Sequence, residues 1–175
     1  MKIYFAAHST TTDNESGNAS GWNDVGLSEL GIKQAKQLAS TFKDIKIDVV
    51  CCSDLKRAVD TVKIAFQDRL PVVIDKRLRE VNYGTFNGKP GKTVGPMKIE
   101  RIDMPFPGGE SYNQAMVRLH EFYNELKKAY KDQTILVVGH RATQYGLDTM
   151  TGKTVEQCLV EQEPFKWQPF WEYNI

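Results

Sequence analysis

Four short apolar runs, separated by amphipathic stretches, constrain most strongly what this chain can fold into. They lie at residues 3–7, 47–52, 72–74 and 135–139. Runs of this length predict buried strands, and the amphipathic stretches between them predict helices. His8 directly follows the first run, and His140 directly follows the last. Because ligands collect at the carboxyl ends of the strands in an open parallel sheet, we expect these two histidines to meet over one site.

Two helices are expected in the first half of the chain. Ser28 is the expected N-cap of a helix that runs toward Phe42. The predicted buried face of this helix consists of Leu30, Gln34, Ala35 and Leu38. Ser53 or Asp54 can cap a second helix, which is expected to end at about Gln67.

The second half begins with a segment that shows no long helical period, residues 75–110. Its prolines predict an irregular excursion: Pro90, Pro96, Pro105 and Pro107. A long helix is expected over residues 111–130, with an apolar face of Met116, Leu119, Phe122, Tyr123 and Leu126. Shorter helices are expected near residues 143–150 and 154–161. The aromatic tail, residues 165–173, is expected to form either an antiparallel edge strand or a packing flap.

This order of elements predicts an α/β protein, a three-layer α/β/α sandwich with a mainly parallel central sheet. We expect a single domain over residues 1–175, because the sequence shows neither an internal repeat nor a domain linker. A content of 41% hydrophobic and 26% charged residues is ordinary for a soluble domain of this length.

Charge and cysteine content limit the classes of partner and location. The formal net charge of +1, without a block of Lys and Arg, argues against nucleic acid or an anionic membrane as the main partner. No apolar stretch approaches the length of a membrane-spanning helix, and residues 1–5 are expected to enter a strand rather than to form a signal peptide. Cys51 and Cys52 are adjacent on an expected buried strand, and Cys158 lies far away. This spacing suits neither a disulfide framework nor a metal site, so we expect a reducing cytoplasm.

Several motifs follow one another between about residues 2 and 145. His8 is followed by Asn14, and a loop with a helix start follows at residues 24–31. The later motifs are Ser53-Asp54-Leu55-Lys56-Arg57-Ala58, Leu78-Arg79-Glu80, residues 83–88, Gly108-Gly109-Glu110-Ser111 and Val137-Val138-Gly139-His140. As an ordered set, these motifs resemble the histidine phosphatase superfamily, also called phosphoglycerate mutase-like. The resemblance implies the fold of that family.

The resemblance also implies phosphoryl transfer through a phosphohistidine. His8 would be the nucleophile, because a neutral imidazole exposes a nucleophilic ring nitrogen near physiological pH. The covalent intermediate divides one difficult displacement into two easier steps. Arg57 would hold phosphate oxygens with its planar guanidinium, and His140 would face His8 across the phosphate. Glu80 would protonate the leaving alkoxide and then activate water. The resemblance implies no metal ion and no cofactor.

The chain departs from the family pattern beside the two histidines. Ala7 stands where the family has its first phosphate-binding arginine, Ser9 replaces a glycine, and Arg141 stands where a small residue is usual. Loss of one preorganised charge-stabilising donor typically costs about 2.7–4 kcal/mol, or roughly 100- to 1000-fold in rate. Arg141 could restore the missing charge from another direction. Together with Ser9 and Asn14, it is a candidate substrate-binding residue.

These features favour a phosphatase that hydrolyses a small phosphate monoester. Mutases of this type are larger and carry insertions, for which 175 residues leave little room. The alternative from another class is a catalytically weak or inactive module that binds a phosphorylated ligand or protein. Phosphatases that act on phosphohistidine proteins are a further possibility, although they tend to lack the loop that carries Glu80. The sequence leaves the substrate and the oligomeric state open.

Overall fold

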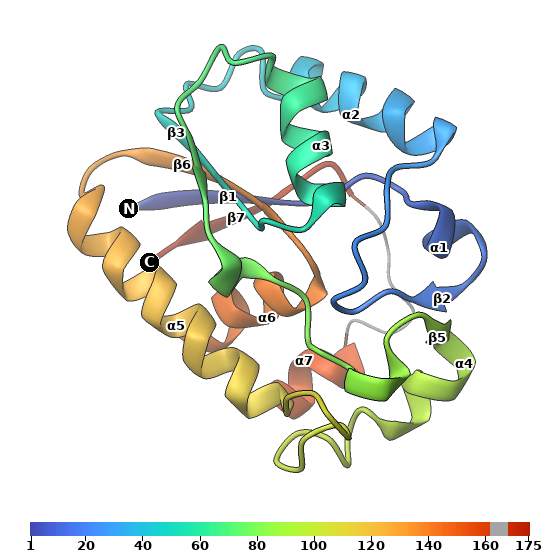
Figure 1. The fold of residues 1–175 in the computed structure, drawn as a ribbon. Coiled ribbons are helices and arrows are strands. Elements are labelled where there is room, and N and C mark those ends of the chain that lie inside the picture. Colours follow the sequence, from blue (N-terminus) through green and yellow to red (C-terminus); the bar gives the residue numbers. More distant parts are fainter. Residues whose placement is uncertain (162–167) are drawn as a thin grey trace.

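A five-stranded sheet forms the centre of the fold in the computed structural model, which describes residues 1–161 and 168–175 (Figure 1). Its strands lie in the order β4–β3–β6–β1–β7. They are β1 (Lys2–Ala7), β3 (Val49–Cys52), β4 (Val72–Ile74), β6 (Thr134–Gly139) and β7 (Trp171–Asn174). Neighbouring strands are parallel, except that β7 runs antiparallel to β1. The predicted, mainly parallel sheet is therefore confirmed.

Helices cover both faces of this sheet and give the predicted three-layer α/β/α arrangement (Figure 1). The longer helices are α2 (Glu29–Thr41), α3 (Lys56–Phe66), α5 (Tyr112–Ala129), α6 (Arg141–Met150) and α7 (Val155–Glu161). Because successive side chains of a strand point to opposite faces, each central strand feeds two cores. In β1, Tyr4 and Ala6 belong to the core beneath α2 and α3, whereas Ile3 and Phe5 belong to the core beneath α5, α6 and α7.

The predicted long helix is present as α5, and its N-terminus explains where it begins. Ser111 is the N-cap, and its side-chain oxygen accepts a hydrogen bond from the backbone N–H of Gln114. The Gln114 side chain returns a bond to the backbone N–H of Ser111, which completes a capping box. All five apolar residues predicted for the buried face are buried: Met116, Leu119, Phe122, Tyr123 and Leu126.

Leu30 is a correction to the predicted buried face of α2. Its side chain is 49% exposed, and Gly31 occupies the buried position instead. A side chain at Gly31 would collide with the backbone carbonyl of Thr10, so the helix approaches the loop after β1 more closely than any larger residue permits. The rest of the predicted face is buried or half-buried: Gln34, Ala35 and Leu38.

The start of α3 also differs from the prediction. Its N-cap is Leu55, whose side chain makes no capping bond. The cap comes from a distant loop, where Asp24 Oδ1 accepts a hydrogen bond of 2.6 Å from the backbone N–H of Lys56. Neither Ser53 nor Asp54 caps this helix, and the Asp54 carboxylate instead pairs with an arginine in the loop after β4.

Residues 75–110 form the predicted irregular excursion and contain no long helix. Their short elements are η1 (Lys76–Leu78), η2 (Gly84–Phe86), β5 (Lys89–Pro90), α4 (Gly91–Val94) and η3 (Gly95–Met97). Strand β5 pairs antiparallel with β2 (Asn18–Ala19), which follows the short helix α1 (Thr12–Glu15). This unpredicted pairing ties the excursion to the loop after β1 (Figure 1).

The C-terminal part follows the predictions with small shifts. Helix α6 begins at Arg141 rather than at residue 143, because His140 occupies its N-cap position, and α7 begins at Val155. The end of the aromatic tail is an antiparallel edge strand, since β7 pairs with β1. The start of that tail, residues 165–167, lies outside the described residues.

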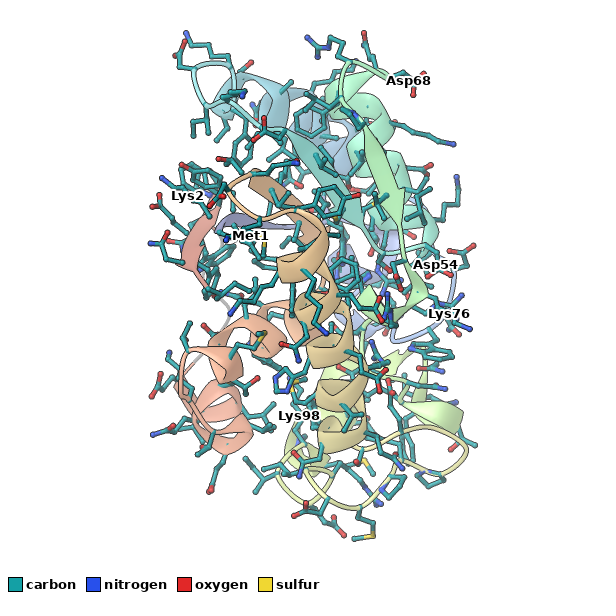
Figure 2. All side chains as sticks on the ribbon, turned by 90° about the vertical axis from the view of Figure 1, so that its left-hand side faces the viewer. Met1, Lys2, Asp54, Asp68, Lys76 and Lys98 are labelled. Atoms are coloured by element: carbon teal, nitrogen blue, oxygen red, sulfur yellow. The ribbon has the colours of Figure 1, made fainter. Side chains whose placement is uncertain are left out.

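The C-terminal edge of the sheet gathers the segments that follow the parallel strands. Cys52 pairs with Ile74 at the ends of β3 and β4. Asp54 and Lys76, each a little further along the chain, lie close together in Figure 2, where α5 crosses in front of the sheet. Asp68, which precedes β4, lies near the top of the same view, apart from Asp54 and Lys76.

Candidate active site

Two histidines meet at the C-terminal edge of the sheet. His8 follows β1 and His140 follows β6, and the two strands are neighbours in which Ala7 pairs with Gly139. The backbone N–H of His8 donates to the carbonyl of Gly139 at 2.9 Å, and the centroids of the two imidazole rings are 5.0 Å apart. A side chain at Gly139 would collide with Thr143 of α6, so this glycine allows the helix to start close to the strand. The expected meeting of the histidines is therefore present.

The hydrogen bonds of His8 define its tautomer. Nδ1 lies 2.8 Å from the carbonyl oxygen of Ser9, and a carbonyl can only accept, so Nδ1 carries the proton. Nε2 therefore presents its lone pair, which accepts a hydrogen bond of 3.2 Å from Arg57 Nε. The backbone N–H of Ser9 donates to Thr61 Oγ1 at 3.0 Å, which fixes the peptide that orients the ring. Burial and the charge of Arg57 lower the pKa of His8 to about 3, so this imidazole is neutral at physiological pH.

Arg57 brings a positive charge to the site, and its side chain is almost completely buried. Its Nη1 donates to the carbonyl of Asn23 at 3.0 Å, and its Nη2 donates to the carbonyl of Gly21 at 2.8 Å. Burial lowers the pKa of Arg57, and the charge of the nearby Glu80 carboxylate acts in the opposite direction. Gly21 has a φ of +53°, a left-handed conformation that favours glycine. The loop can therefore aim its carbonyls at the guanidinium.

Glu80 reaches the same region from the excursion. Its Oε1 accepts hydrogen bonds from the backbone N–H of Val81 at 2.8 Å and from that of Ala142 at 3.3 Å. Ala142 lies in the first turn of α6, directly beyond Arg141, so the carboxylate sits at the positive end of the helix that His140 precedes. The structure thus brings a carboxylate to the helix start that follows His140, close enough to Arg57 for its charge to act on the guanidinium.

His140 is buried and has no hydrogen-bond partner for either ring nitrogen within the described residues. Its backbone N–H donates to Thr143 Oγ1 at 2.9 Å, and that hydroxyl donates to the carbonyl of Leu78 at 2.8 Å. Burial and the charge of Arg57 hold the pKa of His140 well below its ordinary value. Buried polar groups are normally paired, so an unpaired imidazole facing a buried guanidinium is typical of a site for a ligand with acceptor oxygens.

The three remaining predicted residues are Ser9, Asn14 and Arg141. Ser9 is buried and contributes its backbone to the orientation of His8. Asn14 is exposed, and its Oδ1 accepts from the backbone N–H of Thr11 at 2.9 Å, as part of the cap of α1. Arg141 Nη2 donates to the hydroxyl of Tyr145 at 2.8 Å. His8, Arg57, Glu80 and His140 are thus brought together, whereas these other side chains have partners or positions of their own.

Several residues that position the site were missed by the sequence analysis. Gly21 and Asn23 hold Arg57 through backbone carbonyls, which carry no residue-type signature. Arg118 did leave a signal, because it lies three residues after the buried Ala115 and four before the buried Phe122. A charged residue inside an apolar helical stripe indicates a specific buried partner.

Two further searches cover the described part of the chain. Residues 1–161 and 168–175 contain no group of three or more His, Cys, Asp or Glu side chains that could hold a metal ion. Across the same ranges, no helix combines the length and the apolar character needed to cross a membrane.

Comparisons with known proteins identify the family of this chain. A model of the histidine phosphatase superfamily (branch 1) matches residues 3–156. Phosphoserine phosphatase 1 of Hydrogenobacter thermophilus is 32% identical over 154 residues, which cover 80% of this chain and 71% of that protein. A 2,3-bisphosphoglycerate-dependent phosphoglycerate mutase of Allorhizobium ampelinum is 30% identical over 156 residues, covering 79% and 74%. The crystal structure of the alpha-ribazole phosphatase from Shigella flexneri has a TM-score of 0.80 at 26% identity, covering 90% of this chain and 83% of that one. The chain is therefore similar to phosphatases and to a mutase.

Proposed function

The chain belongs to the histidine phosphatase superfamily, branch 1, and from this premise we propose that it hydrolyses a small phosphate monoester through a phosphohistidine at His8. The observation that carries the proposal is the pairing of His8 with Arg57. The Nε2 lone pair of a neutral imidazole lies 3.2 Å from Nε of a buried guanidinium. This arrangement supplies a nucleophile and a preorganised positive charge at the same point.

In the first proposed step, His8 Nε2 attacks the phosphorus atom of the substrate. A nitrogen–phosphorus bond forms while the bond from phosphorus to the leaving oxygen breaks. The Nε–H of Arg57 turns from His8 to a phosphate oxygen, and the N–H of the neutral His140 donates to a second one. Glu80 acts as the general acid and gives a proton from its carboxyl group to the leaving alkoxide.

In the second step, the Glu80 carboxylate takes a proton from water. The water oxygen attacks phosphorus, the nitrogen–phosphorus bond breaks, and His8 returns to its neutral form as inorganic phosphate leaves. The two backbone N–H groups that hold Oε1 fix the direction of the Glu80 carboxyl group. A fixed carboxyl group suits both proton transfers, because general acid and base catalysis requires hydrogen-bond reach to the reacting oxygen.

Three residues are proposed to bind the substrate around this centre. Arg141 would supply part of the charge absent at Ala7, for which its guanidinium has to turn from Tyr145 toward the phosphate. Ser9 would offer its hydroxyl group. Asn14 would offer its amide nitrogen, since its Oδ1 already serves the cap of α1.

Ala7 also favours a second candidate function, a module that binds a phosphorylated ligand with little turnover. The first phosphate-binding arginine of the family is absent, and its loss is worth roughly 100- to 1000-fold in rate. The buried guanidinium and the unpaired His140 ring would still attract a phosphate group. The two candidates differ only in whether phosphate is released.

A panel of phosphate monoesters, assayed for release of inorganic phosphate, separates these candidates. The proposal expects turnover with at least one alkyl phosphate, and an adduct on His8 that is acid-labile and base-stable, as a phosphoramidate is. The His8→Ala variant is expected to lose both the adduct and the turnover. Binding of inorganic phosphate without turnover of any ester would favour the binding module. Transfer of phosphate to an acceptor alcohol rather than to water would favour a mutase.

A further inference from the structure

We propose that Arg118 of α5 is a positioning residue for the proton-transfer step, acting on Glu80 through the backbone of the loop that carries it. The inference rests on the proposed function, because it requires Glu80 to be the proton donor. It adds a residue that contacts neither the phosphate nor the leaving group but decides where the donor points.

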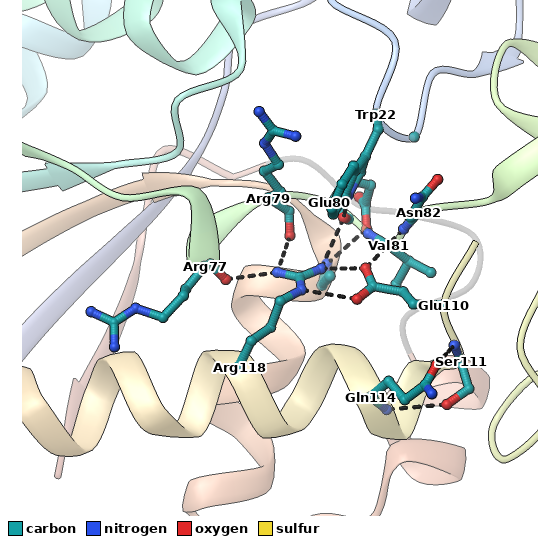
Figure 3. A network of polar contacts seen from close by, with 12 residues as sticks. Trp22, Arg77, Arg79, Glu80, Val81, Asn82, Glu110, Ser111, Gln114 and Arg118 are labelled. Atoms are coloured by element: carbon teal, nitrogen blue, oxygen red, sulfur yellow. Dashed lines mark hydrogen bonds and ion pairs between the residues drawn. The ribbon is translucent and has the colours of Figure 1, made fainter. Parts of the chain in front are cut away.

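The guanidinium of Arg118 donates hydrogen bonds to backbone carbonyl groups of the loop that leads to Glu80, and these bonds restrain the loop (Figure 3). Its Nη1 donates to the carbonyl of Arg77 at 2.6 Å and to that of Arg79 at 2.8 Å. Its Nη2 donates to the carbonyl of Glu80 at 3.0 Å. The side chain of Arg118 is only 16% exposed, so water competes little with these charge-assisted hydrogen bonds.

Glu110 forms an ion pair that holds the guanidinium in this position, and it also binds the loop beyond Glu80. Its Oε2 accepts from Arg118 Nε at 3.0 Å, and its Oε1 accepts from Arg118 Nη2 at 2.6 Å. The same Oε1 accepts from the backbone N–H of Asn82 at 2.9 Å (Figure 3). The ion pair therefore holds the loop through carbonyls up to Glu80 and through an N–H just after it.

The peptide unit between Glu80 and Val81 connects these restraints to the carboxyl group of Glu80. Its carbonyl accepts two hydrogen bonds, one from Arg118 and one of 2.7 Å from the indole nitrogen of Trp22. Its N–H, that of Val81, donates to Glu80 Oε1 at 2.8 Å. Because a peptide unit is planar, fixing its carbonyl also fixes the N–H on its other side. Arg118 thereby sets the donor that aims the carboxyl group toward the first turn of α6.

The experiment compares two substrates that differ in their need for a proton donor. An alkyl phosphate releases a basic alkoxide, which needs a proton from the general acid Glu80. Nitrophenyl phosphate releases a stable phenolate, which does not need that proton. Arg118→Lys keeps the charge but loses the forked geometry. Glu80 also acts in the second step, which both substrates share, so the first step is read alone as the single-turnover rate of leaving-group release. We expect Arg118→Lys to lower this rate for the alkyl phosphate by about tenfold or more, and for nitrophenyl phosphate by less than about threefold, because small misplacements of a catalytic group cost on the order of 100-fold. The dissociation constant of each substrate is expected to change little, because Arg118 contacts neither of them.

Two comparisons separate positioning from a general loss of structure. Arg69→Lys is the matched control, because Arg69 also donates to backbone carbonyls, those of Ala65 and Phe66, in a part of the fold without contact to Glu80. It should leave the ratio of the two rates unchanged. In a Glu80→Gln background, Arg118→Lys should have little further effect on the alkyl phosphate, since both changes remove one function. If Arg118→Lys fails to fold, Glu110→Gln tests the same restraint, because it removes the charge that holds the Arg118 guanidinium.

The outcomes decide the inference separately from the proposed function. An equal loss of the first-step rate on both substrates overturns the positioning role while phosphatase activity stands. Losses that add fully in the Glu80→Gln background overturn it as well. If the unmodified protein releases phosphate from neither substrate, the proposed function fails, and the positioning role fails with it.

Discussion

The fold is expected to lose stability between pH 7 and pH 5 because of its two buried histidines. Burial and the charge of Arg57 lower the pKa of His8 to about 3 and hold that of His140 well below its ordinary value of 6.5. In this window the unfolded chain therefore binds protons that the folded site does not bind. The two neutral histidines make their full contribution to the free energy of unfolding above the unfolded-state pKa of 6.5. This contribution is lost progressively as the pH falls toward the folded-state pKa values.

The size of the effect follows from the width of the window. One pH unit corresponds to about 1.36 kcal/mol for a group that titrates only in the unfolded state. From pH 6.5 to pH 5, each of the two histidines should therefore lower the free energy of unfolding by about 2 kcal/mol. Asp75, whose pKa is lowered, titrates below this window and does not obscure the effect. His120, whose pKa is lowered by burial, acts in the same direction.

Urea unfolding at pH 7, 6 and 5, in phosphate-free buffer, measures this dependence. His8→Gln should remove about 2 kcal/mol of the decline between pH 6.5 and 5, because glutamine does not titrate. His120→Gln changes a histidine outside the site, and it should remove only the contribution of His120 and leave that of His8 unchanged. The reasoning is refuted if His8→Gln shows the same decline as the unmodified protein, or if the unmodified protein shows none.

Further predictions concern the charge and the loops around the site. Arg57→Met should lower kcat by roughly 100- to 1000-fold. It should also shift the acid limb of the pH–rate profile to higher pH, because the charge of Arg57 no longer lowers the pKa of His8. An unshifted acid limb contradicts this cause. Asp24→Ala should lower the free energy of unfolding by about 1 kcal/mol through loss of the α3 cap, as measured by urea unfolding. Ala7→Arg should partly rescue the phosphate affinity lost in Arg141→Ala, and fully independent effects would show that the two positions do not share one role.

The sequence determined the order of elements and the edge on which chemistry-bearing residues gather. Hydrophobic periodicity is a local property, so the strands and the main helices could be predicted from it. His8 and His140 each follow a strand directly, and parallel strands end at one edge, which is why their meeting was predictable. The placement of Arg57 and Glu80 beside them was implied by the family resemblance, with the local support that each follows shortly after a strand.

Only the tertiary structure decided which groups hold these residues in place. Asp24 caps α3 from a separate loop, and Gly31 replaces Leu30 on the buried face because a carbonyl of another segment approaches it. Arg118 joins α5 to the loop of Glu80 by bonds to backbone carbonyls. Every residue carries such carbonyls, so they leave no mark in the sequence. Which of them a buried guanidinium reaches depends on how the loops pack, and that is settled only when segments distant in the chain meet.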